Sequence, residues 1–280
     1  MRRALDYQRQ NYTGDMIQNN SDSPSISGET DSIVEHPLNV TRLEVTRLGF
    51  NTSLSSEQRA VLLSAIGDPD DRVRAGALGA LVRLSGKEAD QAVIEPAEVE
   101  AAWRAAQVDQ SPNVRRRAAE LAPKVRDLLI VLVIELAEDS DETVAEAAAW
   151  ALGEMVGEQY QREDTALADA TLERLAISHK DALVREACVA ALGARGVGLA
   201  TILAACSDKP AVRRRAVLAL SPFEGPEVDA ALQNALTDRD WQVRQAAEDL
   251  LGIDAERQGK DDGDDGADED ASQDADQLGG

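Results

Sequence analysis

The feature that most constrains this chain is a short motif that recurs six times. Each copy places a turn rich in Asp before a Val, usually followed by Arg, and then a run of Ala and Leu at helical spacing. A chain that repeats such a motif at a period of about 30 residues is expected to stack similar units rather than to form one globular core. The motif valines are Val73, Val114, Val144, Val184, Val212 and Val243, which lie 41, 30, 40, 28 and 31 residues apart.

Each repeat is predicted to be a pair of helices joined by the Asp-rich turn. Val73, Ala77, Ala80 and Leu81 fall on one helical face, at steps of three, four and seven residues. One hairpin cannot bury such a stripe, whereas stacked hairpins cover one another, so we predict an all-α solenoid of about six helical hairpins. First helices are predicted at 55–66, 96–106, 127–137, 167–177, 198–205 and 226–236, and second helices at 71–84, 112–125, 142–156, 181–194, 210–220 and 240–251.

The segments outside the repeats have different compositions. Residues 1–53 are rich in polar residues and predict a disordered N-terminal arm, in which 38–50 alternate partly and fit either a short strand or a capping segment. Residues 54–252 hold the repeats. Residues 253–280 carry 11 acidic and 2 basic residues and predict a disordered acidic tail.

The chain is strongly acidic, with a formal net charge of −23, and its bases are 24 Arg against 5 Lys. This balance resembles that of cytosolic proteins from halophilic archaea. The negative charge disfavours nucleic acid and anionic membranes as partners. The longest apolar run, Leu128–Ile134, is too short to span a bilayer, and the N-terminus lacks an apolar stretch typical of a signal peptide. We therefore predict a cytoplasmic protein without a membrane partner.

The recurring Asp-turn-Val-Arg-x-x-Ala-x-x-x-Leu signature resembles the short HEAT-like repeats named after phycobilisome lyases, and it covers residues 54–252. The resemblance implies a ladder in which the turn Asp and the Arg after Val connect adjacent units. The third unit departs from it with Ala145, and in the fourth and fifth units Asp181 and Asp208 lie nearer to the Val. The residues that match the ladder are Arg74, Arg115, Arg185, Arg213 and Arg244, with Asp68, Asp109, Asp139 and Asp238.

Two runs of three arginines stand out against the acidic background. Because the first Arg of each run belongs to the ladder, the other two are predicted to point away from the apolar stripe. They are either ordinary solvated surface or a patch that binds an anion or a partner, on which the acidic tail could fold back. The candidate partner-binding residues are Arg116, Arg117, Arg214 and Arg215, together with Trp241 at the start of a helix.

Groups that carry catalysis are scarce in the sequence. The only histidines are His36 and His179, and Cys188 and Cys206 lack metal-ligand spacing, so no catalytic residue, metal or cofactor is predicted. We predict a non-catalytic scaffold or adaptor that binds one or more proteins, with a possible place in signalling or motility by family analogy. The alternatives are a HEAT-repeat enzyme of the lyase or hydroxylase type and a nucleic-acid-binding protein that uses the Arg runs.

Overall fold

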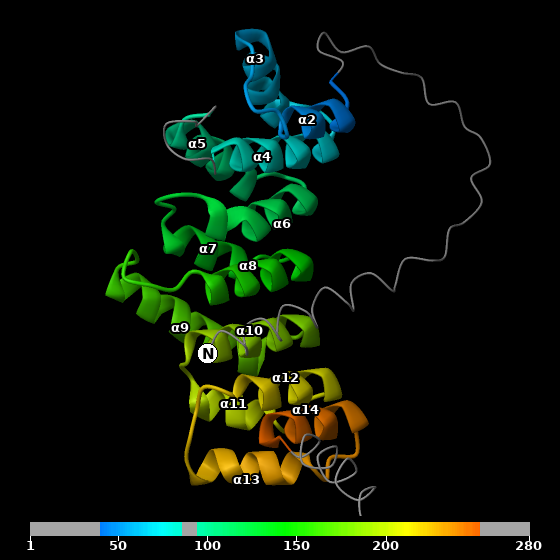
Figure 1. Cartoon of the computed structure of the whole chain (residues 1–280), viewed down its shortest axis with the longest axis vertical. Helices are drawn as coiled ribbons and strands as arrows, with labels where there is room; N and C mark the ends of the chain where they lie inside the picture. The colour runs from blue at the N-terminus through cyan, green and yellow to red at the C-terminus, as the bar shows by residue number, and fades with distance from the viewer. Residues whose placement is uncertain (1–39, 86–93, 253–280) are drawn as a thin grey trace, which may run out of the picture.

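The computed structural model describes residues 40–85 and 94–252, and within these ranges it contains helices and no strand (Figure 1). The prediction of an all-α solenoid is confirmed for this part of the chain. Short 3₁₀ turns, η1 (Ala65–Gly67) and η2 (Ala122–Lys124), follow α3 and α6. The α-helices are α2 (Arg42–Leu48), α3 (Ser56–Ser64), α4 (Asp71–Ser85), α5 (Pro96–Gln107), α6 (Pro112–Leu121), α7 (Ile130–Ala137), α8 (Glu142–Glu154), α9 (Arg162–Ser178), α10 (Ala182–Arg195), α11 (Leu199–Ala205), α12 (Pro210–Ala219), α13 (Pro226–Ala235) and α14 (Trp241–Leu251).

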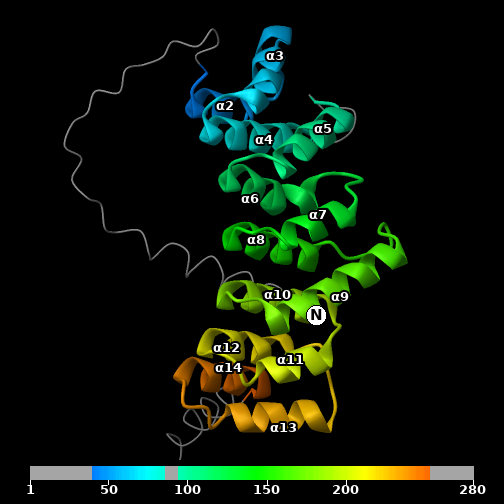
Figure 2. The same ribbon diagram turned by 180° about the vertical axis from the view of Figure 1, so that it is seen from behind.

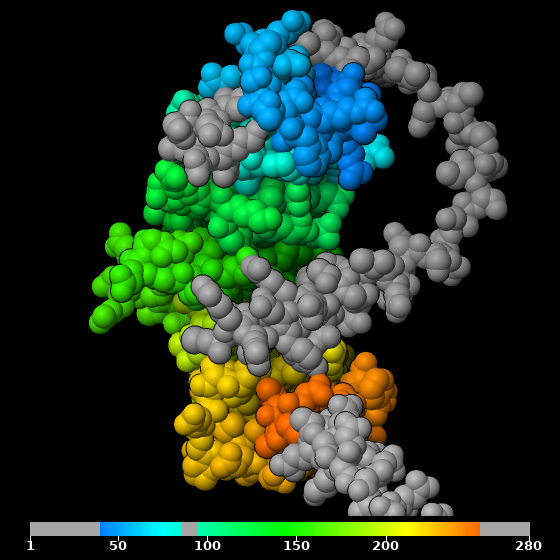
Figure 3. Space-filling view, viewed as in Figure 1, coloured from blue at the N-terminus to red at the C-terminus, as the bar shows by residue number. Residues whose placement is uncertain are grey.

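The helices form two layers along the long axis of the molecule (Figures 1 and 2). The second helices α4, α6, α8, α10, α12 and α14 form one layer, in which each helix packs against the next. The first helices α5, α7, α9, α11 and α13 form the other layer, and each packs against the second helix of its own unit. The units follow one another from α2 and α3 to α14 (Figure 1), and Figure 3 shows the two ends of this stack in blue and orange. The second-helix layer therefore has one face that packs against the first helices and another face that points away from them.

Small residues set the spacing between neighbouring second helices. A Cβ added to Gly153 would lie 3.0 Å from the Ala191 Cα, and one added to Gly193 would lie 2.7 Å from the Ala219 Cβ. Gly153 and Gly193 hold the same place in α8 and α10, nine residues after the motif Val. Larger side chains there would push the helices apart, which explains why the repeats are rich in Gly and Ala.

Three helix ends differ from the predicted ones by more than two residues. The α-helical part of α6 stops at Leu121, because Pro123 has no N–H to continue the hydrogen-bond pattern. Helix α7 begins at Ile130 rather than at Asp127, whose φ of 57° is left-handed and incompatible with a right-handed helix. Helix α9 begins at Arg162, before the predicted start at residue 167, so part of the insertion after the third unit lengthens this helix.

The segment 38–50, for which the pattern allows a strand or a capping segment, contains helix α2, so the strand alternative is wrong. Thr41 and Glu44 form a capping box at its start, and Val45 is fully buried where α2 packs against α4. Helix α2 thus covers the N-terminal end of the second-helix layer. Residues 1–39 of the predicted arm and the predicted tail 253–280 lie outside the described residues.

Candidate functional site

A ladder of Arg–Asp ion pairs joins the turns between first and second helices. Arg74 donates from Nε and Nη2 to the two carboxylate oxygens of Asp109, each at 2.7 Å. Its Nη1 donates to the Asp68 carbonyl at 2.8 Å and to the Pro69 carbonyl at 3.1 Å. One guanidinium therefore binds its own turn with one edge and the next unit's turn with the other.

The same bidentate arrangement occurs in three more places. In every pair the Arg also donates through Nη1 to a carbonyl of its own turn, at 2.8–2.9 Å. The side chains of all four pairs are 7–21% exposed. Asp208 belongs to this set although the sequence prediction did not include it, because its turn is one residue shorter than the others. The three further pairs are Arg115–Asp139, Arg185–Asp208 and Arg213–Asp238, with N–O distances of 2.6–2.9 Å.

The ladder aspartates are also held by their own turns. Asp139 accepts a hydrogen bond from the Asp141 amide at 2.9 Å, and Asp109 accepts one from the Ser111 amide at 2.8 Å. Burial by itself raises the pKa of Asp139, but the hydrogen bonds from Arg115 and from the Asp141 amide outweigh it and hold the pKa below its usual value. The carboxylates therefore stay charged at neutral pH, as the ion pairs require.

The ladder is interrupted between the third and fourth units. Ala145 occupies the Arg position in α8 and is fully buried. His179 occupies the Asp position, where its carbonyl accepts from Arg185 Nη1 and its Nδ1 accepts from the Asp181 amide at 3.1 Å. Both members of this ion pair are thus replaced together, so neither a buried guanidinium nor a buried carboxylate is left without its counterpart.

Arg195 joins the third and fourth units at the opposite ends of their second helices. Its side chain is 4% exposed and forms an ion pair with Asp169. It also donates from Nη1 to the carbonyls of Leu152 and Met155, at 2.9 and 3.1 Å. Arg195 lies outside the repeated motif, so no pattern in the sequence marks it as a connecting residue. A buried Arg thus connects α10 to α8 and α9 where the ladder is interrupted.

The ladder has different surroundings at its two ends. Asp68 accepts a hydrogen bond from the Asp70 amide at 2.8 Å. It belongs to the first hairpin, which is preceded by the single helix α2 instead of by another complete hairpin. Arg244 donates from Nη1 to the Asp238 carbonyl at 2.7 Å, as the other ladder arginines do. Within residues 40–85 and 94–252, however, no carboxylate forms an ion pair with Arg244. The last ladder position is therefore open in the described part of the chain.

The first arginine run is partly neutralised by a carboxylate of its own helix. Arg116 and Arg117 both pair with Glu120, at 3.6 and 2.9 Å. Arg117 also lies close to Gly79 of the preceding unit, where a Cβ would meet its guanidinium at 2.8 Å. Arg116 is the more exposed of the two, with 45% of its side chain accessible.

The second arginine run corrects one prediction. Arg215 does not point to solvent: its side chain is 4% exposed and pairs with Glu186 of α10 at 3.2 Å. Its guanidinium lies 5.3 Å from the centroid of the Trp150 ring of α8, a cation–π distance. The side chain thus extends from α12 across α10 toward α8. Arg215 is an internal connection between three units.

Two other predicted partner-binding residues lie at the surface. Trp241, the first residue of α14, is 63% exposed, which is unusual for the largest apolar side chain. Arg214 is half-buried on α12. Both positions are compatible with binding a partner, which remains a prediction.

The two thiols are poor nucleophiles. Burial raises the pKa of Cys188 to about 12 and that of Cys206 to about 11. Because the thiolate is the reactive form, both stay protonated at neutral pH, which disfavours covalent attachment of a chromophore to either thiol. Among the described residues, no three His, Cys, Asp or Glu side chains gather in a way that could hold a metal ion. In the same ranges, every helix is too short or too polar to cross a membrane.

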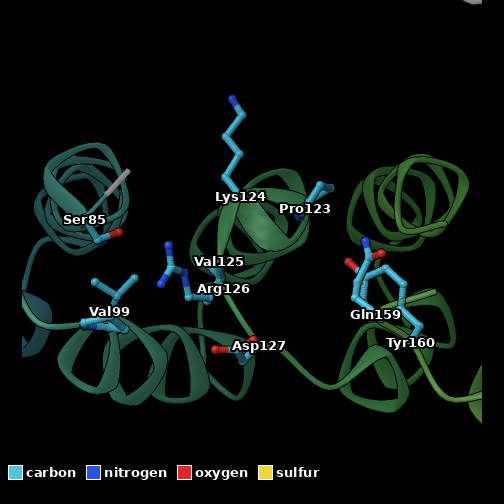
Figure 4. Close-up of a pocket in the computed structure, with 10 residues that line it drawn as sticks. Ser85, Val99, Pro123, Lys124, Val125, Arg126, Asp127, Gln159 and Tyr160 are labelled. Carbon is cyan, nitrogen blue, oxygen red and sulfur yellow. The ribbon is translucent and has the colours of Figure 1, made fainter. Parts of the chain in front are cut away.

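A cavity of about 360 Å³ lies at the edge opposite the ladder turns, between the end of α4, α5 and the segments that precede α7 and α9. Its polar lining includes Arg126, Asp127 and Tyr160. In Figure 4, Arg126 points toward Ser85 and Val99, whereas the Lys side chain at position 124 extends away from the other labelled residues. Arg126 and Asp127 are both exposed, so the cavity is a polar recess open to solvent.

Stacked helical hairpins in two layers, locked by repeated ion pairs between their turns, define a helical-repeat solenoid. A family model described as HEAT repeats matches residues 99–193 and 169–252, which together span 99–252, more than half of the chain. The chain belongs to the HEAT-repeat family. Search of the curated proteins gave no match.

Solved structures of repeat proteins share the fold. One is a chain from the structure of Kap95p with RanGDP, which is 15% identical with a TM-score of 0.56, over 81% of this chain and 36% of that one. Another is YIBA_ECOLI from E. coli, 13% identical with a TM-score of 0.53, over 84% of this chain and 80% of that one. At these identities the similarity establishes the solenoid architecture alone.

Proposed function

We propose that this chain is a non-catalytic protein-binding adaptor that presents its second-helix layer to one or more proteins. The observation that carries the proposal is the long face of this layer opposite the first helices. In each second helix, the residues two and six positions after the motif Val lie about 200–240° around the helix from it. Since the Val packs into the core, these positions point away from the first-helix layer. Both are exposed or half-buried in the second, third and sixth units, whereas the later one is buried in the other three, at Gly79, Ala190 and Leu218. A face assembled from successive units offers an extended surface to a partner.

The composition of this face suits a polar protein interface. The two positions are Arg116 and Glu120 in the second unit, and Glu146 and Trp150 in the third. Trp and Arg are the residues that most often dominate binding energy at protein interfaces. The stacking of Arg215 on Trp150 fixes the indole in one orientation, which reduces the entropy lost when a partner binds.

Two observations favour a protein over a nucleic acid as the partner. The net charge of −23 opposes phosphate binding. Within the described residues, Arg116, Arg117 and Arg215 are already paired with Glu side chains of this chain. Solenoids of this class are generally scaffolds, and Kap95p with RanGDP is one example that holds a protein. We also propose a cytoplasmic location, which rests on the sequence alone, and a place in signalling or motility, which rests on family analogy.

Affinity capture with matched variants tests the proposal. The tagged full chain is compared with Arg116→Glu/Glu146→Lys, which reverses two charges on the proposed face without changing the net charge. The control is Arg126→Glu/Asp127→Lys, an equal exchange at the solvent-exposed recess. Proteins retained by the wild type and the control should be lost from the face variant. Retention of the same proteins by all three forms would refute this face as the binding surface.

A further inference from the structure

The four ladder pairs show which ligand is bound by the outer edge of a ladder Arg, the edge that carries Nε and Nη2. Four times in this chain, the Nε and Nη2 atoms meet both oxygens of an aspartate in the turn of the following unit. In each case that aspartate also accepts a backbone amide one or two residues further along. The preferred ligand of this edge is therefore an aspartate held in a tight turn.

Arg244 is the one ladder Arg without such a ligand among the described residues. Its Nη1 bond to the Asp238 carbonyl places it as the others are placed, so its outer edge is directed beyond the sixth unit. Trp241, 63% exposed, lies three residues earlier in the same helical turn region. The C-terminal end of the stack thus carries a prepared carboxylate site beside an exposed indole.

A second copy of the chain is a poor occupant for this site. To supply Asp68, another molecule would have to stack its first unit on α14. Helix α2 already covers that unit: Val45 is fully buried against α4, and a Cβ at Gly76 would lie 3.9 Å from Val45. The N-terminal end is capped, so head-to-tail stacking is blocked.

We propose that Arg244 binds an aspartate of the acidic segment 261–266 of its own chain. This segment reads Asp-Asp-Gly-Asp-Asp-Gly, and Asp followed closely by Gly favours the turns in which a carboxylate accepts a nearby backbone amide. Residues 253–280 carry 11 acidic and 2 basic residues, which complements the charge of Arg244. The same chain thus contains both the open Arg and several candidate ligands for it.

The tether makes this contact easy to form. Asp261 follows Gly252, the last described residue, by nine positions, a reach of roughly 30 Å when extended. Arg244 lies seven residues before the end of α14, only about 11 Å along the helix. A tether of this length gives an effective concentration in the millimolar range, so a modest affinity is enough.

Quenching of a bimane label by Trp241 tests the proposal in the full chain. The label is placed on Gly266→Cys. Cys188 is buried and Cys206 is half-buried, and the pKa of each is raised, so the new thiol is the reactive one at neutral pH. In the parent the indole should quench the label, and Trp241→Phe sets the unquenched level. Arg244→Gln should raise the fluorescence to that level, whereas the matched charge loss Arg126→Gln should leave it unchanged.

Two further variants separate specific binding from general attraction. Arg244→Lys keeps the charge but lacks the planar fork, so it should also release the label. Asn in place of all four aspartates of 261–266 should do the same, with no added effect in the Arg244→Gln background. Thermal melts monitored by circular dichroism verify that each variant is folded. Quenching that survives in Arg244→Gln, or that is lost equally in Arg126→Gln, would overturn the proposal.

Discussion

Replacing Arg115 by Ala measures what one ladder contact contributes to stability. The substitution removes two hydrogen bonds to the Asp139 carboxylate, at 2.7 and 2.9 Å, and two to carbonyls of its own turn. The Asp139 side chain, 10% exposed, would keep only the Asp141 amide as a donor among these groups. A charged group would then lie buried without its counterion.

The expected cost follows from that loss. Removing one member of a buried ion pair typically costs about 3–5 kcal/mol. Because the Arg115 side chain is 17% exposed, water can enter the vacated space and solvate the carboxylate in part. We therefore expect the free energy of unfolding to fall by about 2–4 kcal/mol.

Urea unfolding followed by circular dichroism provides the measurement, and the adjacent residue provides the control. Arg116 is 45% exposed and lies 3.6 Å from Glu120, so Arg116→Ala should cost less than about 1 kcal/mol. Adding Asp139→Asn to Arg115→Ala should recover part of the loss, because the buried charge is removed as well. Equal costs for Arg115→Ala and Arg116→Ala would show that the ladder does not stabilise the stack.

Three more predictions follow from the same contacts. Ala145→Arg alone should destabilise the chain, and adding His179→Asp should recover stability through a coupling of about 1.5–3 kcal/mol in a double-mutant cycle. The pKa of Asp139 is lowered in the folded state, so its contribution to folding stability is present above its unfolded pKa of about 3.9 and is lost as pH falls through the folded value. The urea midpoint of unfolding should therefore decrease below about pH 4. A urea midpoint that does not change with pH in this range would contradict the prediction. A thiol reagent at pH 7.5 should modify Cys206 before Cys188, because Cys188 is the more deeply buried of the two. Both thiols should react only slowly until the chain is denatured. Rapid reaction of either thiol in the native protein would contradict this prediction.

The helices and most of the ladder could be predicted from sequence because both depend on local patterns. Apolar spacing located twelve helices of the repeats, and the Val-Arg pair marked Arg74 and its equivalents. Asp208 was missed because a turn shortened by one residue moves the carboxylate in sequence while leaving it in place in space. Arg195 was missed because it belongs to no repeated motif.

The burial of Arg215 could not be predicted because it depends on other units. Its helix position is equivalent to that of Arg117, which is 36% exposed. What differs is the neighbourhood: Glu186 of α10 and Trp150 of α8 supply partners to Arg215, whereas the position equivalent to Glu186 in the unit before Arg117 is Ala75. A pattern within one helix contains none of this information, so identical positions in two repeats acquired different roles.

The interruption at Ala145 and His179 shows how the repeats remain mutually consistent. A lone Arg at 145 or a lone Asp at 179 would leave a buried charge unmatched, at a cost of about 3–5 kcal/mol, so the two positions must differ from the repeat together. The junction keeps its order by other means, since Gly153 brings α8 against Ala191 and Arg195 ties α10 to the end of α8. The third and fourth units are therefore joined at the edge opposite the ladder, whereas the other described junctions between full hairpins are joined along it.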